Sequence, residues 1–103
     1  MANHSQVLDA LGDPTRRAVF QRLRGGARSV TEISRGMKVT RPAVSQHLKV
    51  LKAARLVSDR ADGTRRLYAI DSRGVQALRD WLDNFWDAAL VAFKEAAEEE
   101  ARR

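Results

Sequence analysis

The stretch that decides the fold is RPAVSQHLKVLKAA, residues 41–54. Placed on a helix at about 100° per residue, it gathers its apolar residues on one side, namely Val44, Leu48 and Leu51. A second side, about 80° wide, carries basic and hydrogen-bonding residues, namely Arg41, Ser45, Lys49 and Lys52, with Gln46 next to them. The pattern predicts a helix that packs into a domain by one face and leaves a basic face exposed.

The residues just before this helix predict a second helix and a tight turn. Ser29-Val30-Thr31-Glu32 fits a capping box that begins a short helix ending near Arg35-Gly36. Residues 36–39 form the turn, and Thr40 can cap the next helix, which tolerates Pro42 in its first turn. Two helices joined by a short turn containing glycine are typical of a helix-turn-helix.

The flanking sequence completes the predicted fold. A short amphipathic helix is expected over about Ser5–Leu11, and another from Asp13-Pro14 to about Arg24, where Gly25-Gly26 ends it. Strands are expected at residues 56–60 and 65–70, joined by a turn at Asp62-Gly63. Asp71-Ser72 then caps a final helix over about 72–101. The order α-α-α-α-β-β-α predicts a mainly α single domain (1–103), a winged helix-turn-helix with its body and wing at about 5–70.

The charge is divided between these parts. The 103 residues carry a formal net charge of +6. Residues 1–70 hold 14 Lys and Arg against 5 Asp and Glu, whereas residues 71–103 hold 5 against 8. A basic body points to an anionic partner, with nucleic acid or a membrane surface as the first candidates.

The composition also excludes several classes. The chain has no cysteine and only two histidines, His4 and His47, which argues against disulfides, thiolate metal sites and cysteine nucleophiles. Apolar runs are too short for a membrane span, and the first residues do not resemble a signal peptide, so a cytoplasmic protein is expected. No nucleophile–base pair or phosphate loop is evident, so we expect neither an enzyme nor a cofactor.

The basic helix face favours DNA binding, because the first residues of a recognition helix contact base edges in the major groove. The hairpin adds Arg60, Arg65 and Arg66, which suit phosphate or minor-groove contacts and also keep an edge strand soluble. His47 falls beside the apolar side of its helix. We expect it to be a packed histidine bonded to a backbone group.

The last helix carries more apolar surface than one small domain can cover. Its stripe comprises Val75, Leu78, Leu82, Phe85, Ala89, Phe93 and Ala96, flanked by Trp81, Trp86 and Leu90. A helix of this length extends about 45 Å, whereas a domain of 100 residues has a radius of gyration of about 13 Å. Val75 and Leu78 are expected to pack on the body. The stretch from Phe85 to Phe93 is expected to meet a second copy, which would pair the recognition helices about 34 Å apart.

These motifs together resemble the ArsR/SmtB family of bacterial winged-helix repressors. The resemblance covers about residues 6–95 and rests on Leu11–Arg17, on Ser-Gln-His-Leu-x-x-Leu at 45–51, on Leu56-Val57 and on the hairpin at 62–66. It implies a homodimer that represses by occupying an inverted-repeat operator, often that of its own operon, until an effector releases it. It implies that Ser45 and Gln46 face bases, that Thr40, Arg41 and Lys49 hold the neighbouring backbone, and that the hairpin arginines touch flanking DNA.

The family resemblance also implies that the first and last helices form the dimer interface. The residues expected there are Leu8, Leu11, Leu82, Phe85, Trp86, Ala89, Leu90 and Phe93.

The chain departs from the family in its metal sites. The stretch at 29–35 that corresponds to the thiolate site has no cysteine, and the last helix offers Asp80, Asp83 and Asp87 but no histidine. We therefore expect no metal sensing. Trp81–Trp86 resembles a metal-independent branch, and its effector is unknown. Arg55 stands where many members have glycine. If that position adopts left-handed geometry, arginine costs about 1 kcal/mol relative to glycine.

Two alternatives remain open at this stage. The aromatic last helix suits a protein-interaction module that docks a different protein. It also suits a repressor that takes up a small hydrophobic effector between Trp81, Phe85 and Trp86.

Overall fold

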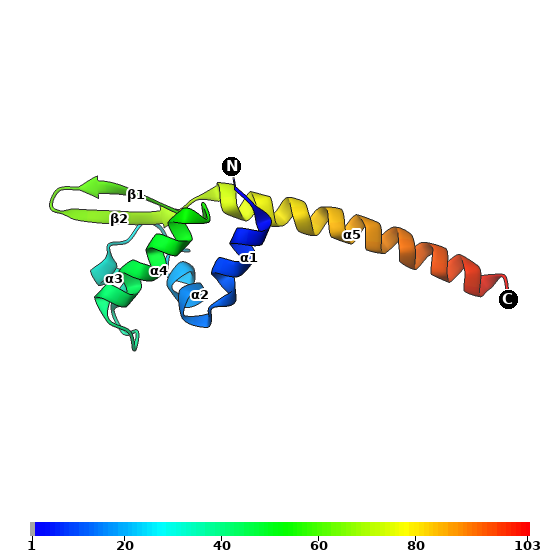
Figure 1. The fold of residues 1–103 in the computed structure, drawn as a ribbon, viewed down its shortest axis with the longest axis horizontal. Helices are drawn as coiled ribbons and strands as arrows, with labels where there is room; N and C mark the ends of the chain where they lie inside the picture. The colour runs from blue at the N-terminus through cyan, green and yellow to red at the C-terminus, as the bar shows by residue number, and fades with distance from the viewer. Residues whose placement is uncertain (1) are drawn as a thin grey trace.

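The computed structural model describes residues 2–103. Its elements follow the order α1 (His4–Gly12), α2 (Pro14–Gln21), α3 (Val30–Ser34), α4 (Arg41–Ala53), β1 (Val57–Asp62), β2 (Arg65–Ile70) and α5 (Ser72–Ala101). Figure 1 shows α1 to α4 gathered into one body, with the hairpin at one end and α5 running out at the other, over dimensions of 69 × 28 × 21 Å. This order confirms the predicted winged helix-turn-helix.

The hydrophobic core forms around α4, which packs against α1, α2, α3 and β1. Its side chains Val44, Leu48 and Leu51 have no exposed surface. The other core residues come from the surrounding elements and loops: Val7, Ala10, Val19, Leu23, Ile33, Ala54, Leu56 and Val57. Because full burial of one such side chain stabilises a fold by about 1.5–3 kcal/mol, this cluster fixes how α4 is rotated about its axis.

The helix starts follow the predicted caps with one extension. Ser29 and Glu32 form both bonds of a capping box at α3, Thr40 caps α4, and Asp13 caps α2. The first helix begins at His4, one residue earlier than predicted, because the Asn3 side chain accepts from the backbone N–H groups of residues 5 and 6 at 2.8 and 3.3 Å.

The end of α2 was predicted too late. The α-helix stops at Gln21 rather than near Arg24, because the following N–H groups bond three residues back instead of four. The amide of Leu23 donates to the carbonyl of Phe20 at 3.0 Å, and that of Arg24 donates to Gln21 at 3.3 Å. Leu23 is buried in the core although it lies beyond the end of α2. Its apolar spacing therefore made the predicted helix too long.

The hairpin has a different turn from the one predicted. Asp62 pairs with Arg65, which leaves Gly63-Thr64 as the two-residue loop and extends β1 to Val57–Asp62. Gly63 has φ 63°, a backbone conformation that glycine adopts without a Cβ penalty. The backbone groups of Arg28 and Tyr68 also bond reciprocally at 2.9 and 2.8 Å, so the loop before α3 is joined to the wing.

The junction between the body and α5 depends on two residues that lie far apart in sequence. Arg55 has φ 64°, so the position does adopt the left-handed geometry in which arginine is costlier than glycine. Its carbonyl accepts from the amide of Gly74 at 2.8 Å. A Cβ at position 74 would lie 2.7 Å from that carbonyl oxygen, so only glycine lets α5 approach this closely.

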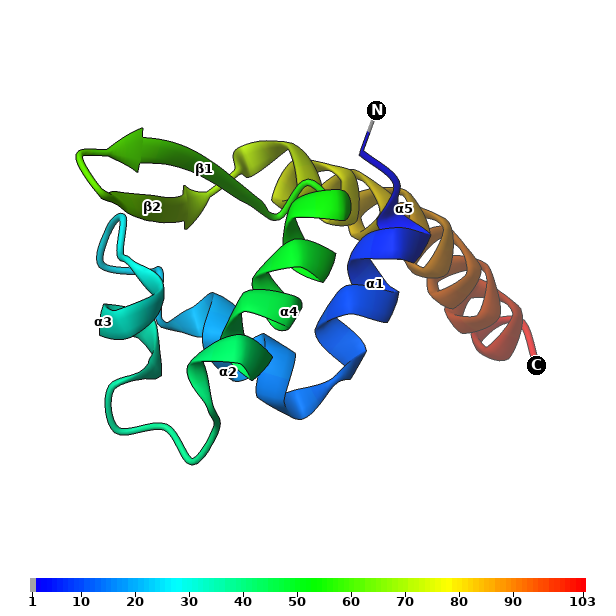
Figure 2. The same cartoon turned by 60° about the vertical axis from the view of Figure 1, so that its left-hand side comes forward.

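The long helix α5 begins at Ser72 with Asp71 as its cap, and its span matches the prediction. Only its first part contacts the body, through α1 and through the bond of Gly74 to Arg55 (Figures 1 and 2). Leu78 packs against the core as expected, but the prediction for Val75 was wrong. Val75 is 42% exposed because Gly74 and Leu78 occupy the side that faces the body, about 100° and about 60° away from it. Within residues 2–103, no helix combines the length and the apolar character needed to cross a membrane.

Candidate nucleic-acid interface

The helix-turn-helix consists of α3, the turn at residues 35–40, and α4. Gly36 has φ 80° within the turn, and the Thr40 hydroxyl accepts from the Ala43 amide at 3.2 Å where α4 begins. Figure 2 shows α4 running through the middle of the body, with the hairpin extending from near its C-terminal end. The wing and the second helix of the motif are therefore neighbours in space.

A second side of α4, next to its buried residues, is exposed along its length. The residues that the sequence predicted for DNA contact at this helix are all exposed: Thr40, Arg41, Ser45, Gln46, Lys49 and Lys52. Their spacing brings the short polar side chains of Ser45 and Gln46 near the N-terminal half and the two lysines toward the C-terminal half. An exposed face of this composition provides both hydrogen-bonding groups and positive charge.

Two of the three basic side chains among them have partners in their own chain. The Arg41 guanidinium lies 3.3 Å from the Thr31 hydroxyl on α3. The Lys52 ammonium lies 2.7 Å from the Asp59 carboxylate on β1. Lys49 has no ion pair within residues 2–103, so its charge is available to an external anion.

Of the three hairpin arginines, two form ion pairs and one does not, within residues 2–103. Arg65 pairs with Asp62 at 3.2 Å and with Glu32 of α3 at 3.3 Å. Arg66 pairs with Asp59 at 3.3 Å. Arg60 is exposed and, in the part of the chain that the structure describes, has no ion pair.

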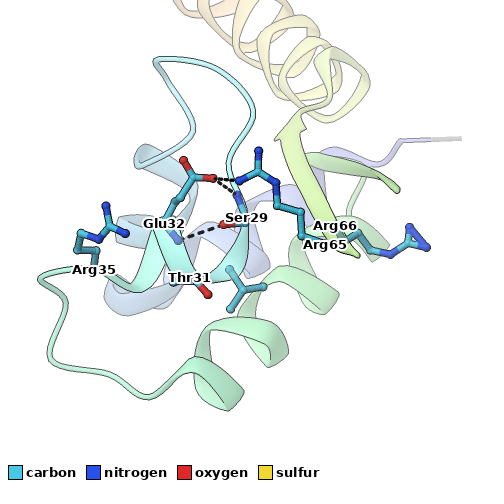
Figure 3. A pocket seen from close by; sticks show the side chains of 7 residues that line it. Ser29, Thr31, Glu32, Arg35, Arg65 and Arg66 are labelled. Carbon is cyan, nitrogen blue, oxygen red and sulfur yellow. Dashed lines mark hydrogen bonds and ion pairs between the residues drawn. The ribbon is translucent and has the colours of Figure 1, made fainter. Parts of the chain in front are cut away.

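A hollow of about 360 Å³ lies between α3 and the hairpin, lined by Ser29, Val30, Thr31, Glu32, Arg35, Arg65 and Arg66. Figure 3 shows Arg65 pointing back toward Glu32, whereas Arg66 points away. The Ser29 backbone N–H, which donates to Glu32 at 3.0 Å, lowers the pKa of that carboxyl, with further help from Arg65. At neutral pH Glu32 is therefore ionised. It accepts from the Ser29 amide in the α3 capping box and pairs with Arg65 of the wing.

Asp59 was not predicted as a functional residue, yet it joins α4 to both strands of the wing. It shares the core-facing side of β1 with Val57, two residues earlier, which is the one sequence signal that would have found it. The hydrogen bond from Lys52 is the main cause that lowers the pKa of Asp59, and Arg66 adds to it.

His47 is half-buried, as predicted. The backbone partner expected for it is not found within residues 2–103. It lies close enough to Asp13 to contribute to the lowered pKa of that carboxyl, whose main cause is the backbone N–H of Arg16.

The residues predicted for dimerisation form an exposed ridge on α5. Leu82, Phe85, Trp86, Leu90 and Phe93 are between 47% and 60% exposed, and Ala89 is half-buried among them. On α1, Leu8 is exposed, whereas Leu11 packs partly against its own core. His4 stacks on Trp81 with ring centres 5.3 Å apart, which brings the start of α1 onto the same side of α5.

The described residues hold no cluster of three His, Asp or Glu side chains that fits a metal ion. Asp80 of α5, for example, accepts a hydrogen bond from Gln76 at 2.8 Å.

Comparison with known proteins agrees with this geometry. A helix-turn-helix domain model matches residues 11–60. The chain is 54% identical over 91 residues to the HTH-type transcriptional regulator Rv2034 of Mycobacterium tuberculosis, covering 88% of this chain and 85% of that protein. It is 32% identical over 81 residues to the transcriptional repressor SdpR of Bacillus subtilis, covering 79% of this chain and 90% of SdpR.

Among solved structures, an ArsR-like transcriptional regulator from Rhodococcus sp. RHA1 superposes with a TM-score of 0.75 at 27% identity. The match covers 90% of this chain and 91% of that one. The likeness therefore extends beyond the helix-turn-helix to most of the fold.

Proposed function

This chain belongs to the ArsR/SmtB family of winged helix-turn-helix transcriptional regulators, and on that premise we propose that it is a homodimeric repressor that occupies an inverted-repeat operator. Its function is regulatory rather than enzymatic, and the partner of its helix-turn-helix is double-stranded DNA. Because its proposed partner is operator DNA, we expect the protein to act in the bacterial cytoplasm. The promoter of its own operon is the first candidate operator.

The observation that carries the proposal is the orientation of α4. Full burial of Val44, Leu48 and Leu51 fixes which side of the helix faces outward. That side bears Ser45, Gln46 and Lys49 and adjoins the arginine-bearing wing. A major groove about 12 Å wide admits a helix presented in this way.

The proposed contacts follow from chemistry and position. Gln46 can bond an adenine through both ends of its amide, and Ser45 can bond any base edge within reach. Thr40 and Arg41 at the start of α4 and Lys49 near its end suit the flanking phosphates. Arg60 on the wing suits phosphate or minor-groove contact.

The exposed ridge of α5 supports dimerisation. Apolar side chains half exposed to water over several helical turns are costly unless another surface covers them. A twofold partner covers the ridge with its own copy and repeats the recognition helix. An inverted repeat in the operator corresponds to this symmetry.

Regulation without a metal ion is part of the same proposal. The stretch at 29–35 has no cysteine and α5 has no histidine, so neither donor set of the family's selective metal sites is present. Repression is expected to be insensitive to chelator.

The test is a binding competition at moderate salt. Short duplexes selected from a random library by the wild-type protein are compared with shuffled duplexes of the same composition, with and without chelator. We expect selection of an inverted repeat and a preference of at least about a thousandfold over the shuffled duplex. Equal affinity for both would contradict the proposal. A stable monomer in sedimentation analysis would favour a different protein as the partner of α5.

A further inference from the structure

A single carboxylate is placed between the recognition helix and the wing. The Oδ1 atom of Asp59 lies 2.7 Å from Nζ of Lys52 on α4, and its Oδ2 atom lies 3.3 Å from Nε of Arg66 on β2. Its side chain is only 10% exposed, whereas those of the two cations are 57% and 53% exposed. The group thus joins the last turn of α4 to both strands.

This arrangement differs from an ordinary surface ion pair. An exposed pair contributes little, because water and salt screen it. Here the carboxylate is largely removed from water, so losing it would leave two cations facing each other without compensation. The Asp62–Arg65 pair at the hairpin tip provides the contrast: its carboxylate is 49% exposed and forms no bond to α4.

The cations of the DNA-facing surface therefore fall into two groups. Lys52 and Arg66 share the charge of Asp59. Lys49 and Arg60 have no such partner within residues 2–103. A phosphate would have to compete with Asp59 for the first two cations, whereas the second two are available without any rearrangement.

We propose that Asp59 is a positioning residue that holds the wing against α4 through Lys52 and is itself held in place by Arg66 of the second strand. In this arrangement the Lys52–Asp59 pair sets the distance between the two DNA-contacting elements, Arg66 holds Asp59 from the second strand, and Lys49 and Arg60 contact phosphates. A fixed distance limits which operators satisfy the helix and the wing at once, so Asp59 determines specificity without touching DNA. The inference rests on the proposed function, because it assumes that α4 and the wing bind one duplex.

The first test compares two lysines three residues apart on α4. Binding of Lys49→Gln and Lys52→Gln to the selected duplex is measured across a salt series. Removal of a phosphate contact makes the slope of log K against log salt shallower by about 0.9 per protomer. We expect that change for Lys49→Gln only. For Lys52→Gln we expect an unchanged slope and a lower ratio of selected to shuffled affinity. An equal change in slope for both variants would overturn the inference.

The second test uses Asp59→Asn, with Asp62→Asn as a control that removes the same charge from the same hairpin. Asp59→Asn should free two cations for phosphates and make the slope steeper by up to about 1.8 per protomer. It should also lower the selected-to-shuffled ratio about tenfold, the effect of roughly one mismatched base pair. Asp62→Asn should leave the ratio unchanged, and Asp59→Glu should restore much of it. Identical behaviour of Asp59→Asn and Asp62→Asn would contradict the role of Asp59.

The two proposals fail in different ways. If the wild-type protein does not prefer the selected duplex, the proposed function fails. If the wild type prefers the selected duplex but Lys49→Gln and Lys52→Gln change the salt slope equally, only the positioning role of Asp59 fails. Circular dichroism at the assay temperature establishes that each variant is folded, and if Asp59→Asn is not, the lysine pair decides the question alone.

Discussion

The helices α4 and α5 are both amphipathic, but what covers the apolar side of each is different. On α4 the side chains of Val44, Leu48 and Leu51 are completely buried by its own chain, which leaves its polar side free for a partner. On the outer part of α5 the apolar side itself is exposed, from Leu82 to Phe93. One helix is thus fixed by the fold and binds through polar groups. The other extends beyond the fold and offers apolar surface to a second copy.

We expect the largest loss of stability when a core residue of α4 is truncated. Leu48→Ala removes a fully buried side chain that the surrounding helices cannot replace. We expect the free energy of unfolding to fall by about 2–5 kcal/mol. Urea denaturation followed by circular dichroism measures this change. A loss below about 1 kcal/mol would mean that α4 is less firmly packed than its burial indicates.

The matching substitution on α5 should act on assembly rather than on folding. Phe85 is 59% exposed, so Phe85→Ala should weaken dimerisation by about 2 kcal/mol or more, roughly thirtyfold in the dissociation constant. Analytical ultracentrifugation over a concentration series measures it.

Val91→Ala is the matched control for Phe85→Ala. Val91 is 57% exposed but lies on another side of α5, about 120° from Phe85. We expect its dissociation constant to stay at the wild-type value. If the two variants weakened dimerisation equally, the ridge would not be the interface.

At the junction between the body and α5, a substitution should raise the stability of the protein rather than lower it. Arg55 holds a left-handed conformation that costs a non-glycine residue about 1 kcal/mol, so Arg55→Gly should stabilise the protein by up to that amount. The gain in thermal stability is measured by calorimetry. Destabilisation would show that the Arg55 side chain contributes more than its backbone strain costs.

The smallest expected effect concerns the cap of α5. The Arg73 side chain, which donates to Asp71 at 2.6 Å, lowers the pKa of Asp71 below its ordinary value of 3.8. Since the folded pKa is the lower one, Asp71 contributes stability above pH 3.8 that is lost as the pH falls through the folded value.

Asp71→Asn keeps a capping acceptor but not the charge. Its stability should therefore fall less steeply with acidification than that of the wild type. Urea titrations between neutral pH and about pH 3 compare the two slopes. If the free energy of unfolding of the two proteins fell equally steeply with acidification, the Asp71–Arg73 pair would have no effect on stability.

Much of this comparison was predictable from the sequence, because it depends on local signals. The capping residues Ser29, Thr40 and Asp71 fixed three helix starts, and the apolar spacing in residues 41–54 gave the buried side of α4. Only the family resemblance singled out Arg55 as a position where glycine is common, and the structure shows its left-handed conformation. For the candidate site, the predicted residues of α4 are exposed together, and their contact with DNA stays a prediction.

What the sequence could not provide depends on contacts between distant residues. The joining of Lys52 and Arg66 through Asp59 requires the wing to be placed against α4. The reciprocal bonds of Arg28 with Tyr68 have the same origin. Val75 was misplaced because Gly74, which allows α5 to approach Arg55 closely, rotates the helix so that Val75 faces solvent.

Hydroxyl-radical footprinting of the wild-type protein on the selected duplex tests the central claim most directly, because it reports the recognition helices and the dimer at once. Two recognition helices joined through α5 should protect two stretches whose centres lie about 10 base pairs, or one helical turn, apart. The pattern should disappear on the shuffled duplex. A single protected stretch, or protection that does not depend on sequence, would contradict the account.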